Sequence, residues 1–238
     1  MSMTEGEWLT CSDPEPMLGF LLGRVSERKV RLFACGCCRR IWHLVTRRRS
    51  RRAVEVVERY CDGLADAEEL RRAEDAATAA FMDAPDNSCD EMVGRLSADL
   101  AGRDAWRAAL SAGEAADVAA HVAVYGVDPD EPATEVSEAA YRAARHAERA
   151  LQCSLLRDLV GNPFRSTAID PCWLTRVDGT VRRLAQVIHD ERRFGDLPVL
   201  ADALEEAGCT DADILGHCRS GGEHVRGCWV VDCLLDRD

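Results

Sequence analysis

The 238-residue chain lacks the features that would place it in a membrane or direct it out of the cell. It contains no run of 18 apolar residues, so the sequence offers no conventional membrane-spanning segment. Its first residues are acidic and polar, whereas a secretory signal peptide has a basic flank and an apolar centre. We therefore expect a cytoplasmic protein that has no membrane partner.

Familiar catalytic motifs are missing as well. The sequence holds no G-x-S-x-G, G-x-x-x-x-G-K, G-x-G-x-x-G or H-E-x-x-H, which mark hydrolases, nucleotide-binding folds and zinc proteases. It also lacks the E-x-x-H pair that a four-helix di-iron bundle needs. Whether the protein is an enzyme stays uncertain from sequence, and the missing active site favours a non-catalytic role.

Lysine is nearly absent, with Lys29 alone against many arginines. The formal net charge is -12, which repels nucleic acid unless a local basic patch overrides it. Residues 47–52 form such a patch with five arginines in six positions, but no aromatic side chain lies among them to stack on bases. Nucleic acid is therefore not an expected partner, and we expect these arginines to pair with acidic helices or with an acidic protein.

The stretch from residue 26 to 45 organises the chain. Its apolar residues recur every three or four positions, at Val30, Phe33, Ala34, Cys37, Ile41, Leu44 and Val45. This spacing predicts a core helix that begins at a serine cap, Ser26.

The remaining periodicity predicts a mainly α fold, an orthogonal multi-helix bundle with an alanine-rich helical hairpin or arm inserted. We expect residues 1–61 and 151–238 to form a single domain, since both ends are rich in large apolar side chains. Residues 62–150 are the alanine-rich helical insertion. The last apolar element, residues 227–235, is predicted as a helix, with a buried strand as the alternative.

Twelve cysteines raise the question of metal binding. Soft ligands gather in two places, and the six candidate metal ligands are Cys35, Cys38, His217, Cys218, His224 and Cys228. Cys35 and Cys38 share a helix face at i and i+3, and a tetrahedral zinc takes four such cysteine or histidine ligands. We nevertheless expect these thiols to be buried without metal, as cysteines in cores often are, and the protein to have no cofactor, with zinc as the alternative.

A thiol-based enzyme or redox protein is a third hypothesis. Arg39 and Arg40 flank the C-x-x-C pair and favour a thiolate. A redox pair of this kind normally lies at a helix N-terminus, however, whereas this pair lies in mid-helix. The hypothesis is therefore the weakest of the three.

Four blocks of sequence carry a resemblance: EWLTCSDP, RLFACGCCRRIWHL, GNPFR and HVRGCWVVD. Together they resemble an uncharacterised family of proteins that is abundant in planctomycete genomes. The blocks cover the two ends of the chain and leave the alanine-rich middle outside. The resemblance implies kinship and no activity.

These observations favour a non-catalytic helical module for protein-protein interaction or regulation, with a protein of unknown identity as its partner. A zinc-binding structural or sensing protein is the alternative.

Overall fold

The protein is all-α in the parts of the chain that its structure, a computed structural model, describes: residues 2–85, 89–125 and 135–237. Those residues contain no strand, which confirms the predicted mainly α, multi-helix class. The chain divides into two compact units, Met1–Cys153 (unit 1) and Ser154–Asp238 (unit 2). We predicted that residues 1–61 and 151–238 form a single domain. These ranges include residues of both units, and that packing stays a prediction.

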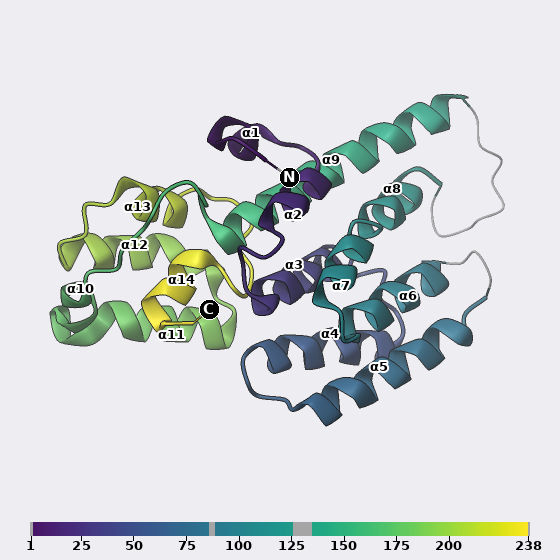
Figure 1. The fold of residues 1–238 in the computed structure, drawn as a ribbon, viewed down its shortest axis with the longest axis horizontal. Helices are drawn as coiled ribbons and strands as arrows, with labels where there is room; N and C mark the ends of the chain where they lie inside the picture. The colour runs from purple at the N-terminus through teal and green to yellow at the C-terminus, as the bar shows by residue number, and fades with distance from the viewer. Residues whose placement is uncertain (1, 86–88, 126–134, 238) are drawn as a thin grey trace. The chain divides into compact units, whose positions relative to one another are not determined.

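Unit 1 contains eight helices and the greater part of a ninth among its described residues (Figure 1). Their bounds are α1 Glu5–Thr10, α2 Pro14–Leu21, α3 Glu27–Arg40, α4 Arg48–Cys61, α5 Ala67–Met82, α6 Cys89–Ala101, α7 Ala105–Ala112, α8 Ala115–Tyr125 and α9 Glu135–Val160. Local sequence sets many of the N-termini. Ser26 accepts a hydrogen bond from the Lys29 amide (3.3 Å), and Asp66 accepts one from Glu69 (2.7 Å), so both cap their helices as such side chains commonly do.

The core helix is shorter than predicted. α3 ends at Arg40, and the chain then turns, because Ile41 leaves helical geometry at φ -97 and ψ 22. Arg51 stabilises this turn through its Nε, which donates to the carbonyl oxygen of Val45 (2.5 Å). Ile41 and Val45 remain 1% exposed, so the apolar stripe is buried although its end is not helical.

The alanine-rich helices pack directly on the core helices. α5 and α6 contact α4, and α7 contacts α3. Small side chains such as Ala77 and Ala109 are fully buried at these interfaces, where they allow close approach of the helix backbones. The middle of the chain therefore completes the core of unit 1 around α3 and α4.

The arginine-rich segment before and within α4 pairs with acidic helices, as expected from the sequence. Arg47 contacts Asp90 (3.2 Å), and Arg49 contacts Asp83 (2.6 Å). These contacts place the two arginines against the start of α6 and the end of α5.

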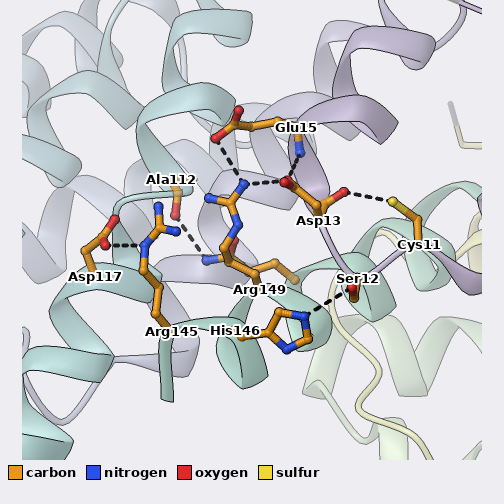
Figure 2. Close-up of polar contacts among 10 residues, drawn as sticks. Cys11, Ser12, Asp13, Glu15, Ala112, Asp117, Arg145, His146 and Arg149 are labelled. Atoms are coloured by element: carbon orange, nitrogen blue, oxygen red, sulfur yellow. Dashed lines mark hydrogen bonds and ion pairs between the residues drawn. The ribbon is translucent and has the colours of Figure 1, made fainter. Parts of the chain in front are cut away.

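A polar cluster fixes α9 to the segment between α1 and α2 (Figure 2). Arg149 donates to the carboxylates of Asp13 and Glu15, the latter at 3.0 Å, while Asp13 also caps α2. Nearby, Ser12 Oγ lies 3.4 Å from His146 Nε2. The Arg149 side chain is only 9% exposed, so this contact ties the start of the chain to α9 from within a largely buried position.

Unit 2 begins inside α9 and continues with short helices (Figure 1). They are α10 Pro171–Thr175, the 3-10 turn Val177–Gly179, α11 Thr180–Glu191, the 3-10 turn Phe194–Asp196, α12 Leu197–Glu206, α13 Ala212–Cys218 and α14 Trp229–Leu235. α11 packs on α12 and α14, and α13 packs on α12 and α14. The last element is a helix, which confirms the first of the two predictions for it, and its Val230, Val231 and Leu234 lie in the core of the unit.

None of the helices in the described part of the chain combines the length and the apolar character needed to cross a bilayer.

Candidate metal centre

Four potential metal ligands converge within unit 2: Asp158, His217, His224 and Cys228. Their ligand atoms all lie within 4.8 Å of one another. Asp158 is on the last turn of α9, His217 is near the end of α13, His224 lies in the following loop, and Cys228 is the N-cap of α14. The group therefore joins four separate segments.

Asp158 contacts both histidines of the group. Its side chain is 3% exposed, and its Oδ1 lies 2.6 Å from His224 Nδ1 and 3.2 Å from His217 Nε2. Its other oxygen, Oδ2, accepts a hydrogen bond from the Val225 amide (2.9 Å). α9 ends just beyond, at Val160, and Gly161 follows it with a φ of +71, the left-handed conformation that commonly ends a helix.

His217 bridges the carboxylate and the thiol. Its Nε2 lies 3.1 Å from Cys228 Sγ, and its ring contacts Trp229 with centroids 5.2 Å apart. Asp211 caps α13 by accepting from the amides of Asp213 and Ile214, which fixes the helix that carries the ring. The His217 side chain is 15% exposed and is therefore more accessible than those of His224 (7%) and Asp158 (3%).

Opposing effects act on the Asp158 carboxyl. Burial raises its pKa, but the hydrogen bonds and charges of His217 and His224 outweigh that effect, so the net pKa lies below the ordinary value. Asp158 is therefore ionised at neutral pH and can bind a cation without first losing a proton.

Cys228 is fully buried, and burial raises its pKa well above the ordinary value, with the charge of Asp158 acting in the same direction. The backbone N–H groups of Val231 and Val230, at the start of α14, oppose this by favouring the thiolate. Without a cation nearby the thiol stays protonated. A divalent ion between Cys228 and Asp158 would supply the missing positive charge and displace that proton.

The donor set fits zinc. Two imidazole nitrogens, one thiolate and one carboxylate oxygen are all ligands that zinc takes at about 2.0–2.3 Å. Tetrahedral bonds of that length place the ligand atoms about 3.3–3.8 Å apart, and the observed contacts of 2.6, 3.1 and 3.2 Å, with an upper limit of 4.8 Å, bracket that range. Small side-chain adjustments would therefore suffice to seat the ion.

Outer contacts already orient the ligands. Val225 holds the second oxygen of Asp158, and Ser220 Oγ lies 3.4 Å from His224 Nε2, the nitrogen that faces away from the carboxylate. Supporting contacts of this kind are usual around protein-bound zinc, because they fix the tautomer and direction of each ligand.

The structure brings together three of the six predicted ligands: His217, His224 and Cys228. Cys218 is buried beside His217 on α13 but is not a member of the group. Burial raises its pKa to about 12, and the nearby thiol of Cys209 adds to the effect. It behaves as a core cysteine of unit 2.

Cys35 and Cys38 lie on α3 in unit 1 and are 2% and 3% exposed. Burial raises the pKa of Cys35 well above its ordinary value and that of Cys38 to about 12, and the charge of Glu58 contributes to both. Neither residue belongs to the four-residue group. That Cys35 and Cys38 bind a metal together with the C-terminal cysteines and histidines stays a prediction.

Sequence reasoning missed Asp158. The signal was an acidic residue inside the apolar end of a helix, LLRDLVGNP, where a buried carboxylate needs a partner. Its spacing of 59 residues from His217 hides the relation from any local motif.

Comparisons with protein-family models, curated proteins and solved structures found no match. The fold and the site define the class directly: a mainly α protein whose second unit carries a largely buried Asp-His-His-Cys group of metal-ligand type. The resemblance to planctomycete proteins stays a prediction.

Proposed function

We propose that unit 2 binds one zinc ion through Asp158, His217, His224 and Cys228, and that the ion is structural. One observation carries the proposal: four ligand-type atoms from four segments lie within 4.8 Å of one another in a largely buried position. Four protein ligands complete the tetrahedral shell and leave no position for water or substrate, which separates a structural site from a catalytic one.

The ion would fasten a part of the unit that has little other regular structure. Residues 219–228 connect α13 to α14 without a helix and contain Gly221, Gly222 and Gly227. A segment of this kind loses much conformational freedom when it folds. Zinc bound only by the folded state stabilises it by about 4 kcal/mol when free zinc exceeds the dissociation constant a thousandfold.

This function is compatible with the non-catalytic interaction or regulatory module predicted from sequence, which remains a proposal. The thiols of α3 support it, because buried thiols of raised pKa are poor nucleophiles. Cytoplasmic location also remains a proposal, supported by Cys35, Cys38 and Cys218, which are not in disulfides.

The test is a metal analysis of the purified chain and of three variants. We expect one zinc per chain in the wild type and in Cys218→Ser, which alters a buried thiol next to His217 as a matched control. We expect loss of the metal in Cys228→Ser and in Asp158→Asn. Cobalt substitution should give thiolate-to-metal charge-transfer absorption that Cys228→Ser abolishes.

The competing explanation is a buried hydrogen-bonded cluster that needs no metal. It predicts no stoichiometric metal, no effect of a chelator on the melting temperature, and destabilisation of Asp158→Asn that is equal with and without added zinc. That set of results would overturn the proposal.

A further inference from the structure

A groove in unit 1 lies between α4 and α5 and has a volume of about 420 Å³. Four arginines line it, Arg48, Arg49, Arg52 and Arg72, above a floor that includes Val56 and Ala73. The arginines are exposed, whereas Val56 and Ala73 are buried. The groove therefore combines a charged rim with an apolar base.

Positive charge around the groove exceeds the negative charge that could neutralise it. Glu69 is shared by Arg52 (3.1 Å) and Arg59 (2.5 Å), and Glu68 is shared by Arg71 (2.9 Å) and Arg72 (3.8 Å). Arg71 also contacts Asp75 (2.8 Å), and Arg49 contacts Asp83 (2.6 Å). With Arg48, six arginines in and beside the groove thus meet four carboxylates.

Arg48 makes no ion pair with any residue in the described part of the chain, and it begins α4. That helix also has no acidic residue in its first turn and no side-chain hydrogen bond at its N-cap. The positive end of the α4 dipole therefore adds to the positive field of the arginines. At the start of α5, by contrast, Asp66 and Glu69 offset the helix dipole. Local arrangements that oppose stability in this way are typical of functional sites.

We infer that this groove binds an acidic segment of a partner protein, one that carries several carboxylates and an apolar side chain. Arginine forks match carboxylates with paired hydrogen bonds, and the apolar floor accepts an aliphatic anchor. The groove follows α4 from Arg48 to Val56, a length of about 12 Å at 1.5 Å per residue, so it offers several contact points to an extended or helical peptide.

Other anions fit less well. The residues that line the groove include no aromatic side chain on which a base could stack, and the net charge of -12 repels long polyanions more strongly than a short acidic segment. A single phosphate would engage only a fraction of the arginine rim.

The experiment measures binding of a fluorescein-labelled peptide of glutamates around a central leucine to the full chain, by fluorescence anisotropy at low salt. We expect saturable binding that weakens about tenfold in Arg48→Glu and in Arg72→Glu, the loss anticipated for one charge-assisted contact. Arg48→Glu places an acid in the first turn of α4, which favours the helix, so its loss of binding would not come from unfolding.

The matched control is Arg142→Glu on α9, an exposed arginine that makes no hydrogen bond or ion pair with the residues described. It changes the net charge equally and should leave the affinity within about twofold, well below the tenfold expected for a groove contact. Equal weakening by Arg142→Glu, no binding of the peptide, or tighter binding of pyrophosphate or of a single-stranded oligonucleotide would each overturn the inference.

Discussion

Replacement of Glu58 by alanine should destabilise unit 1 more than any other single charge deletion on α4. Glu58 is 3% exposed at its side chain, and it accepts two hydrogen bonds from Arg39, to Oε1 at 3.0 Å and to Oε2 at 2.7 Å. The guanidinium group of Arg39 lies 3.9 Å from the ring centroid of Trp42. The carboxylate therefore holds an arginine that also stacks on an aromatic ring.

The expected loss in the free energy of unfolding follows from this geometry. Two unit charges about 3 Å apart attract by about 5 kcal/mol at an effective dielectric constant of 20, and desolvation offsets much of that attraction. Breaking a buried pair costs about 3–5 kcal/mol, because the remaining charge stays partly buried. Arg39 keeps 25% of its side chain exposed, so water can reach it, and we expect about 3 kcal/mol for Glu58→Ala.

The assay is urea unfolding followed by circular dichroism, together with hydrogen exchange of peptides from α3 and α4 to show that the loss is local. Glu55→Ala is the matched control, because it removes a less buried carboxylate from the same helix and should change stability by less than about 0.5 kcal/mol. A loss below about 1 kcal/mol for Glu58→Ala, within the range of surface pairs, would refute the reasoning.

Three further predictions concern packing and access. Phe33→Ala should cost about 3–5 kcal/mol in urea unfolding, since Phe33 is 1% exposed and truncation leaves a cavity; a cost below about 1 kcal/mol would show that the core refills the space. In native protein at pH 8, Cys172 should react with a thiol reagent long before Cys38, because Cys172 is exposed whereas burial raises the pKa of Cys38 to about 12. Mass spectrometry of the labelled peptides gives the order in which the two thiols react. Unfolding should remove the difference, and equal rates in the native protein would contradict the prediction. Gly161→Ala should lower the melting temperature of unit 2, because Gly161 has a φ of +71 and an added Cβ would lie 3.1 Å from the Trp229 ring; an unchanged melting temperature would mean that the ring moves freely.

Local signals in the sequence determined most of the helices. The cap at Ser26 and the apolar spacing after it predicted the start and the buried face of α3, because capping and a 3.6-residue period involve residues a few positions apart. The end of α3 escaped prediction. Ile41 and Val45 continue the apolar stripe, but Arg51, from the next helix, bonds the turn that separates them.

In the candidate site, too, some features follow from local sequence and others from tertiary contacts. His217, His224 and Cys228 lie within 12 residues of one another, so their clustering and their metal-ligand chemistry were visible in the sequence. Cys218 carried the same chemical signal and packs in the core instead, because adjacent residues on a helix point about 100° apart.

Asp158 belongs to the group only because α9 ends beside the loop that follows α13. The two segments are far apart in sequence and meet through a carboxylate that accepts from His224 and from the Val225 amide. The sequence by itself determined which residue types and which helices this protein has. Only the tertiary structure decided which of the twelve cysteines lies beside a carboxylate and which packs in a core. The reason is that these positions depend on packing between segments that are distant in the sequence.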